Sequence, residues 1–173
     1  MIRAEEPGDR DAIRMVVAAA FDSPSEASLV EAIRDSPEYL PELSLVAVLD
    51  GHVAGHVMIS YAALTMAAQK HRVAMLSPLA VAPGLQGQGI GSALVRAVTG
   101  RADERGEPLV VLEGSPVFYG RLGFEPAQRY GIRIDLPAWA PSEAAQVLRL
   151  SRYEPSWRGQ VVYPAAFDQV QHR

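Results

Sequence analysis

The sequence predicts an α+β fold in which a mixed, mostly antiparallel central sheet is flanked by about four helices. Three observations predict this class. Segments with the apolar spacing of helices alternate with short apolar segments typical of strands. The dipeptide Asp50-Gly51 joins two such strands and is the strongest two-residue hairpin signal. Residues 73–112 follow the order strand, loop, helix, strand, which indicates a right-handed βαβ unit with parallel strands.

Two helices are predicted close to the N-terminus, after a short strand at residues 2–6. Asp9 begins the first helix, and its apolar residues recur at helical spacing as far as Phe21. The second helix begins with the capping box Ser23-Pro24-Ser25-Glu26, which has proline at the first helical position. It ends before Pro37, and we expect its apolar stripe to be buried.

The middle of the chain is rich in predicted strands. Residues 45–49 and 52–61 form the two strands of the hairpin, and residues 73–81 form the next strand. Pro78 interrupts that strand and cannot donate a ladder hydrogen bond. It therefore indicates an edge, a bulge or a splay in the sheet at this point.

After a glycine-rich turn, the chain continues with a helix that ends near Gly106. The remaining predicted elements are a strand at 109–112, a short helix at 116–122, a strand from Gly123-Phe124, and antiparallel strands at 131–135, 146–150 and 159–163. No internal repeat or linker divides the chain. We expect a single domain over residues 1–173, with its central motifs in 73–125 and a strand-rich C-terminal segment in 131–170.

The composition is typical of a globular protein, since 49% of the 173 residues are hydrophobic and 21% are charged. The net charge of −4 and the lack of an arginine-rich run argue against nonspecific binding to nucleic acid. The absence of cysteine excludes disulfides, a cysteine nucleophile and thiolate metal ligands. No apolar window approaches about 18 residues and no N-terminal leader pattern occurs, so we expect no membrane partner and a cytoplasmic location.

The histidines do not suggest a metal site. His52, His56, His71 and His172 lack the spacing of zinc ligands. His52 and His56 would share one face of a helix, but their segment is predicted to be a strand, which favours two solvated or hairpin histidines. We therefore expect no bound metal.

Residues 79–92 hold the most informative pattern in the chain. An apolar strand leads into Gly87, Gly89 and Gly91, and a helix begins directly after them. This order places free backbone N–H groups and the positive end of a helix dipole in one concavity, which glycine leaves open to a ligand. It predicts a cradle for phosphate or pyrophosphate, with an ordinary turn as the alternative. We expect the cradle to comprise Leu79, Ala80, Val81, Gln86, Gly87, Gln88, Gly89, Ile90, Gly91 and Ser92.

The details of the loop distinguish between phosphate ligands. A Walker-type loop needs Gly-Lys-Ser/Thr, but the only lysine is Lys70. A dinucleotide loop needs G-x-G-x-x-G, but these glycines are spaced G-x-G-x-G. The pattern Q/R-x-x-G-x-G/A does match, with Gln86, Gly89 and Gly91 at its defining positions. In this respect the chain resembles the GNAT N-acetyltransferase superfamily, whose members bind the pyrophosphate of acetyl-CoA with that loop.

A second motif supports the resemblance. Tyr119-Gly120-Arg121-Leu122-Gly123-Phe124 matches the Y-x-x-x-G-F segment that follows the glycine loop in many GNAT proteins. Together the two motifs make residues 73–125 similar to that family. The tail, with residues 159–164 and Phe167, is similar to the YhbS-like branch, whose substrates are poorly defined. The resemblance implies a splayed sheet that admits the pantetheine arm of acetyl-CoA.

The resemblance also implies a reaction, the direct transfer of an acetyl group from acetyl-CoA to a primary amine. A backbone N–H near Ala80 or Val81 would polarise the thioester. Tyr119 matches the position of the general acid that reprotonates coenzyme A, and the alternative is that its ring only packs near the sulfur. The segment that includes the second helix would wall the acceptor pocket, with a simple packing helix as the alternative.

The general base is harder to assign. Many GNAT relatives carry a glutamate on the strand before the glycine loop, but residues 73–79 contain none. Glu113, at the end of the next strand, is the nearest carboxylate. It can act as a base directly, act through water, bind the ammonium of the acceptor, or cap the turn at Ser115. We assign Tyr119 and Glu113 as candidate catalytic residues.

Two other functions remain open at this point. A catalytically silent acyl-CoA-binding sensor would keep the cradle without turnover, and the missing strand glutamate is compatible with it. A nucleotide-binding protein is disfavoured by the absence of the Lys-Ser/Thr pair. The identity of the amine acceptor is not encoded in any motif, and strands of the tail are candidates for pairing across a homodimer.

Overall fold

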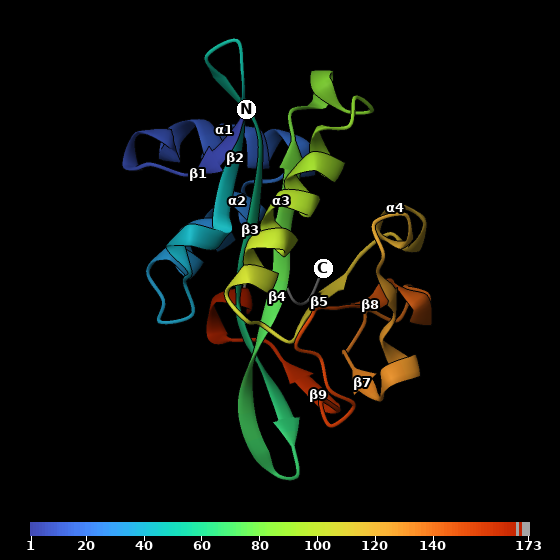
Figure 1. The fold of residues 1–173 in the computed structure, drawn as a ribbon. Coiled ribbons are helices and arrows are strands. Elements are labelled where there is room, and N and C mark those ends of the chain that lie inside the picture. Colours follow the sequence, from blue (N-terminus) through green and yellow to red (C-terminus); the bar gives the residue numbers. More distant parts are fainter. Residues whose placement is uncertain (169, 171–173) are drawn as a thin grey trace.

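The computed structural model describes residues 1–168 and 170, and within them nine strands form one mixed sheet (Figure 1). Its main path runs β1-β2-β3-β4-β5-β8-β6, while β9 pairs with β3 and β7 pairs with β9. The strands are β1 Ile2–Ala4, β2 Ser44–Leu49, β3 His52–Met66, β4 Gln69–Val81, β5 Leu109–Glu113, β6 Glu125–Pro126, β7 Ile132–Arg133, β8 Ala145–Arg149 and β9 Gly159–Val162. The predicted α+β class with a mostly antiparallel sheet is confirmed.

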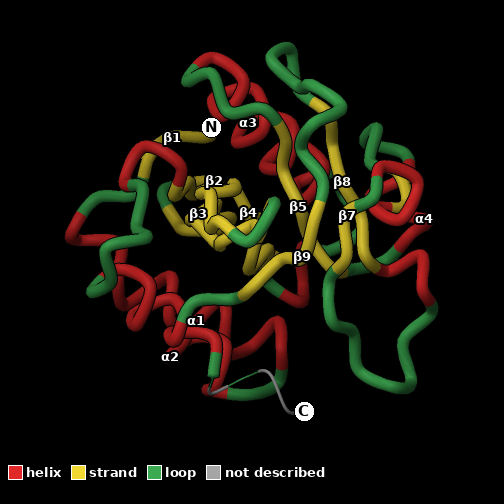
Figure 2. The backbone as a smooth tube through the Cα atoms, turned by 90° about the horizontal axis from the view of Figure 1, so that it is seen from below, coloured by secondary structure: helices red, strands yellow, loops and turns green. Residues whose placement is uncertain are grey.

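Four α-helices occur in the described part of the chain, as predicted. They are α1 Arg10–Phe21, α2 Pro24–Arg34, α3 Ile90–Glu104 and α4 Pro116–Gly120. Viewed along the strands, β2–β4 lie between α1 and α2 on one side and α3 on the other (Figure 2). Side chains of β3 alternate between two cores: Met58 packs in the core with α1 and α2, whereas Val57 packs in the core with α3.

The N-terminal predictions are confirmed in their essentials. Ser23 is the N-cap of α2 and accepts a hydrogen bond from the backbone of Ser25 at 3.3 Å. Asp9 is the N-cap of α1, but its carboxylate accepts from the backbone of Glu6 and from Arg3 instead of from α1. The strand β3 continues past Tyr61 to Met66.

Pro78 lies at a bulge, one of the three outcomes that the sequence suggests. In the antiparallel pair of β3 and β4, Val57 opposes Leu79 while Ile59 opposes Leu76. Two residues of β4, Ser77 and Pro78, therefore face one residue of β3. The bulge shifts the register within the strand that leads into the glycine loop.

The sheet also opens between β4 and β5. These strands run parallel, as predicted for the βαβ unit, but they pair only through Ala74 with Val110 and Met75 with Val111. Residues 76–81 of β4 continue without β5 beside them, whereas β5 pairs along its whole length with β8 on its other edge. The expected splay is therefore present, and it lies directly before the glycine loop.

The tail strands pair within the chain. The strand β8 is antiparallel to β5 and β6, and β9 is antiparallel to β3, as the sequence predicts. The strand β7 is an exception, since it runs parallel to β9 through Ile132 with Gly159 and Arg133 with Gln160. The prediction of antiparallel pairing is wrong there, because the chain between β7 and β9 first visits β8 and returns in the same direction. None of the helices in residues 1–168 and 170 combines the length and apolar character of a membrane span.

Candidate active site

The glycine loop follows β4 and ends at the N-terminus of α3. Gly87 has a φ of 78° and Gly89, the N-cap of α3, has a φ of 87°. Side chains rarely adopt this left-handed conformation, although a Cβ at either position would meet no atom within 4 Å. Glycine is thus required at both positions for its backbone conformation, and the space in front of the loop is open. The first turn of α3 leaves backbone N–H groups without helical partners at this open surface.

The loop is held against β4 and α4. The amide of Gln86 donates a hydrogen bond to the carbonyl oxygen of Val81 at 3.1 Å. At Gly91, a Cβ would lie 3.5 Å from the Phe118 ring and 3.8 Å from Leu79, which is ordinary contact. The motif's tolerance of alanine at Gly91 therefore has a steric basis. Residues 86–89 are exposed, so the chemistry of the loop fits an anion that arrives from solvent.

A cavity of about 370 Å³ occupies the opening between β4 and β5. Its lining includes Leu79 at the end of β4, Glu113 at the end of β5, and Tyr119 on α4. The structure thus brings both candidate catalytic residues to the place where the sheet is splayed. Of the ten predicted cradle residues, only Leu79 lines this cavity, and the rest of the cradle lies beyond it along β4 and α3.

Tyr119 is positioned by packing. A Cβ at Gly114 would lie 2.7 Å from Cε2 of Tyr119, so glycine at that position lets the ring lie across the end of β5. The ring also makes edge contacts with Phe118 and Phe124, with centroids 4.8 and 5.5 Å away. Burial raises the pKa of Tyr119 to about 12. Its hydroxyl is therefore protonated throughout the neutral range and available as a proton donor.

The pKa of Glu113 is raised above that of an ordinary glutamate, although its side chain is exposed to solvent. Loss of solvent in the cavity raises its pKa, a hydrogen bond from Tyr163 lowers it, and the charge of Glu26 raises it further. The net direction is upward, which moves the carboxyl toward the range of a general base. The predicted role as a cap of the Ser115 turn is not needed, because the Ser115 hydroxyl itself accepts from the backbone of Phe118 at 3.2 Å.

A second cavity, of about 840 Å³, adjoins the first. Glu26, Glu113, Tyr163 and Val170 line both cavities, and the larger one adds Asp135 and Trp139 among others. Sequence reasoning did not select Glu26, Asp135, Trp139 or Tyr163 as site residues. Tyr163 carried a signal, since it lies in the tail segment that resembles the YhbS-like branch. Asp135 and Trp139 carried none, because they belong to a loop between strands.

A separate polar group is buried between α2 and the sheet, which we call the Glu5 network. Glu5 accepts hydrogen bonds from Arg34 at 2.8 Å, from the Tyr39 hydroxyl at 2.9 Å and from the Ser44 hydroxyl at 2.6 Å. Burial alone would raise the pKa of Glu5, but Arg34 and the two hydroxyls lower it. The side chains of Glu5 and Arg34 are only 5% and 6% exposed, so the ion pair is buried.

His56 completes the Glu5 network. The sequence left a solvated or a hairpin histidine open: His56 lies on a strand of the β2–β3 hairpin, and the solvated alternative is wrong. His56 is fully buried, and its Nε2 lies 3.0 Å from the Ser44 hydroxyl. Since that hydroxyl donates to Glu5, Nε2 carries the proton and donates to Ser44. Burial lowers the pKa of His56 to about 4. The reason for the error is that β3 is a central strand, whose side chains are covered on both faces by helices.

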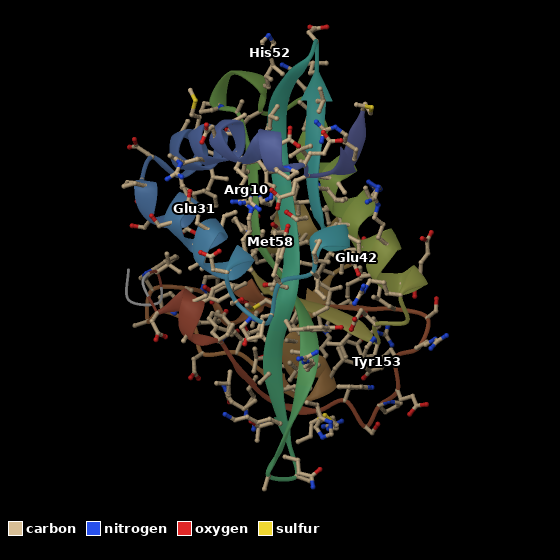
Figure 3. The ribbon with its side chains drawn as sticks, turned by 90° about the vertical axis from the view of Figure 1, so that its left-hand side faces the viewer. Arg10, Glu31, Glu42, His52, Met58 and Tyr153 are labelled. Atoms are coloured by element: carbon tan, nitrogen blue, oxygen red, sulfur yellow. The ribbon has the colours of Figure 1, made fainter. Side chains whose placement is uncertain are left out.

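The other two described histidines, His52 and His71, do not belong to the Glu5 network. Figure 3 shows His52 at the tip of the β2–β3 hairpin, whereas Met58 lies midway along β3. His71 packs edge-on against Trp157 with ring centroids 6.1 Å apart. His172 lies outside the described residues. Within residues 1–168 and 170, no group of three histidine, cysteine, aspartate or glutamate side chains could hold a metal ion.

Comparisons with known proteins agree with the two motifs. Residues 1–127 match the acetyltransferase (GNAT) domain family. YhbS of Escherichia coli strain K12, described as an uncharacterized N-acetyltransferase, is 33% identical over 153 residues, which are 87% of this chain and 87% of YhbS. YjhQ, another uncharacterized N-acetyltransferase of that strain, is 33% identical over 121 residues, or 70% of this chain and 67% of YjhQ.

Two solved structures are similar over nearly the whole chain. The crystal structure of E. coli YhbS in complex with CoA has a TM-score of 0.85 and 32% identity, and covers 97% of this chain and 91% of YhbS. A GNAT family acetyltransferase from Brucella melitensis in complex with acetyl-CoA has a TM-score of 0.78 and 31% identity, and covers 97% of both chains. The predicted resemblance, including its YhbS-like branch, is confirmed, and this chain belongs to the GNAT acetyltransferase family.

Proposed function

We propose that this protein transfers the acetyl group of acetyl-CoA directly to a primary amine, with Tyr119 as the proton donor to the departing thiolate. One observation carries the proposal: Tyr119 and Glu113 line a single cavity in the opening between β4 and β5, next to a left-handed glycine loop at a helix N-terminus. The CoA and acetyl-CoA complexes of the two similar structures support the choice of cosubstrate.

The proposed binding mode uses the cradle and the splay for different parts of acetyl-CoA. The backbone N–H groups around Gly87, Gly89 and Gly91 would bind the pyrophosphate. The edge of β4 at residues 76–81, which β5 does not cover, would pair with the amides of the pantetheine arm as an added strand does. The thioester would then lie near Tyr119, where a backbone N–H at Ala80 or Val81 polarises its carbonyl.

The reaction requires a neutral amine. An alkylamine with a pKa near ~10.4 is neutral in only about 1 molecule in 2,500 at pH 7, so removal of its proton matters. Glu113 is the proposed acceptor of that proton, directly or through water. The amine nitrogen then attacks the thioester carbon, the new C–N bond forms and the C–S bond breaks. Tyr119 gives its proton to the sulfur and regains one from solvent, so the products are the acetylated amine and coenzyme A.

The first test measures cosubstrate binding by thermal unfolding. Acetyl-CoA at about 100 times its Kd should add roughly 2.7 kcal/mol of stability, seen as a higher Tm, whereas ATP and NAD should not. In the variant Gly89→Asp, the added carboxylate would repel the pyrophosphate and abolish the shift. Gly89→Asn is the matched control, because asparagine has the same shape, tolerates the left-handed conformation and adds no charge. An equal shift in the Asp and Asn variants would contradict the cradle.

The second test separates an enzyme from a silent acyl-CoA sensor. Tyr119→Phe should lower kcat by about 10²–10⁴-fold, the usual contribution of a general acid, and leave the acetyl-CoA shift in Tm unchanged. Glu113→Gln should lower kcat most below the pKa of the amine, where a base is needed. A normal shift in Tm without coenzyme A release from any amine in a panel would support the sensor instead.

A further inference from the structure

The amine acceptor has to reach the thioester from outside the cradle, and the structure offers a route. The cavity of about 840 Å³ shares four of its lining residues with the cavity that holds Tyr119. It is bounded by the loop that contains Asp135 and Trp139, by the strand β9 and by the first turn of α2. This larger cavity, which we call the outer cavity, is therefore the approach to the reacting centre.

The charge of the outer cavity has one sign. Its ionisable lining groups are the carboxyl groups of Glu26, Glu113 and Asp135 and the hydroxyl of Tyr163, and no arginine, lysine or histidine lines it among residues 1–168 and 170. These groups are close enough to interact electrostatically. The charge of Glu26 raises the pKa of Glu113, and the charges of Glu113 and Asp135 raise the pKa of Tyr163. A ligand with a carboxylate would be repelled here, and a cation would be attracted.

The acidic groups are distributed along the route. Glu26 and Glu113 line both cavities, so they lie at the inner end, near Tyr119. Asp135 lines the outer cavity and not the inner one, and its carboxylate accepts a 3.3 Å hydrogen bond from Gln160. The outer end thus holds negative charge at a place removed from the reacting centre.

An exposed aromatic side chain lines the same cavity as Asp135. Trp139, one of the two tryptophans of the chain, is 79% exposed and lines the outer cavity. Tryptophan is the best aromatic partner for a cation, and the exposed ring of Trp139 is accessible to a ligand in this cavity. A carboxylate and an indole ring that line one cavity both attract an organic cation.

We propose that the acceptor is a dication. Its reacting primary amine lies near Glu113 and Glu26, and its second positive charge binds at Asp135 and Trp139. This inference rests on the proposed acetyl transfer and names its substrate class. An aliphatic diamine or polyamine fits this description, whereas a monoamine lacks the second charge and an amino acid brings a carboxylate of the wrong sign.

The test compares three acceptors by the rate of coenzyme A release from the intact protein with acetyl-CoA. They are 1,4-diaminobutane, butylamine and 4-aminobutyrate, which differ in the group at the far end. The diamine should exceed butylamine in kcat/KM by about fivefold to tenfold, more than the factor of two that its two identical ends supply. The gain should come from a lower KM. The aminobutyrate should be the poorest acceptor.

Variants then locate the second charge. Asp135→Asn and Trp139→Ala should each bring the ratio of the diamine to butylamine down toward two. Glu143→Gln is the matched control, since Glu143 is an exposed acid on the 3-10 helix Ser142–Ala144 and does not line the outer cavity, and it should leave the ratio unchanged.

Failure of the inference differs from failure of the proposed function. Equal kcat/KM values for butylamine and the diamine, or a ratio that survives in both Asp135→Asn and Trp139→Ala, would overturn the dicationic acceptor while acetyl transfer stands. No coenzyme A release with any of the three amines, together with no shift in Tm by acetyl-CoA, would overturn the proposed function and this inference with it.

Discussion

The helix α2 connects two groups of carboxylates that behave in opposite ways. Its last turn holds Arg34, the cation of the buried Glu5 network, and its first turn holds Glu26, which faces both cavities. Each charge suits the helix dipole at its own end. In the Glu5 network the pKa of the carboxyl is lowered, and at the cavities the pKa of Glu113 is raised.

The difference between the two groups lies in their partners. The side chain of Glu5 is buried whereas Glu113 is exposed, yet Glu5 has an arginine and two hydroxyl donors, which compensate for the lost water. Among residues 1–168 and 170, Glu113 has Tyr163 as its hydrogen-bond donor and a second carboxylate, Glu26, nearby. A carboxylate whose hydrogen-bond and charge partners are complete, such as Glu5, contributes to stability. A carboxylate without a cationic partner, such as Glu113, can accept a proton or bind the cationic group of a ligand.

The largest expected effect comes from removing the cation of the Glu5 network. Arg34→Met leaves Glu5 buried without its charge partner and should lower the free energy of unfolding by about 3–5 kcal/mol. Urea denaturation at pH 7 measures it. The double variant Glu5→Gln with Arg34→Met should lose less than the sum of the single variants, because the unpaired charge is gone. Strict additivity would contradict the pairing.

A pH titration of stability gives the next effect. His56 stays neutral in the fold down to a pKa of about 4, whereas in the unfolded chain it is protonated below about 6.5. The unfolded state therefore binds the extra proton between these values, and stability falls as the pH falls from 6.5 to 4, by about 3 kcal/mol in total.

The same titration on variants assigns the effect. His56→Gln should remove most of the pH dependence between pH 6.5 and about 5.5, above the range in which Glu5 of the unfolded chain takes up a proton. His52→Gln, at an exposed hairpin tip, should retain the full dependence. A flat profile in the unmodified protein between pH 6.5 and 4.5 would mean that His56 is not buried as a neutral group.

Two tyrosines with the same raised pKa of about 12 sharpen the comparison. Tyr39→Phe removes a hydrogen bond to the charged Glu5 and should cost about 1.5–3 kcal/mol of stability without lowering kcat. Tyr119→Phe should do the reverse, since burial alone raises the pKa of Tyr119. The free energy of unfolding and kcat, measured on both variants, test this difference. A loss of kcat in both variants would show that the Glu5 network and the cavity of Tyr119 are coupled.

The smallest expected effect is at the surface. Arg14 pairs with Glu31 on the outer sides of α1 and α2, where the side chains are 54% and 37% exposed. Arg14→Gln should cost under about 1 kcal/mol, because solvent screens an exposed ion pair. A loss as large as that of Arg34→Met would mean that burial does not decide the value of these ion pairs.

The sequence predicts the turns of the sheet only where they follow known chemistry. Asp50-Gly51 joins β2 and β3 with positive φ angles at both residues, as its turn type requires. The turn between β3 and β4 uses Ala67 and Ala68, also at positive φ, and no sequence rule selects them. There the long ladder between β3 and β4 fixes the turn, a tertiary effect that local preference does not contain.

The residues of the candidate site also fall into two groups: those that a local sequence pattern reveals and those that only the folded chain brings together. Gln86, the three glycines, Tyr119 and Glu113 are recognisable because each belongs to a local motif or to the end of a strong strand pattern. Glu26 comes from α2, whereas Asp135 and Trp139 come from the loop after β7, and these two segments meet only when the tail folds back beside β3. Burial of His56 depends on α1 and α2 covering β3, which strand alternation alone does not reveal. Contacts between distant segments are what the sequence could not supply.

The uncovered stretch of β4 has a consequence for handling the protein. Residues 76–81 present peptide groups that β5 does not pair with, and such a row is a template for any extended chain, including another copy of this one. A bound ligand that forms hydrogen bonds with these peptide groups prevents them from pairing with another chain. We therefore expect solutions kept with excess acetyl-CoA to stay free of aggregates longer than solutions of the protein alone. The cosubstrate would then protect the strand edge to which it binds.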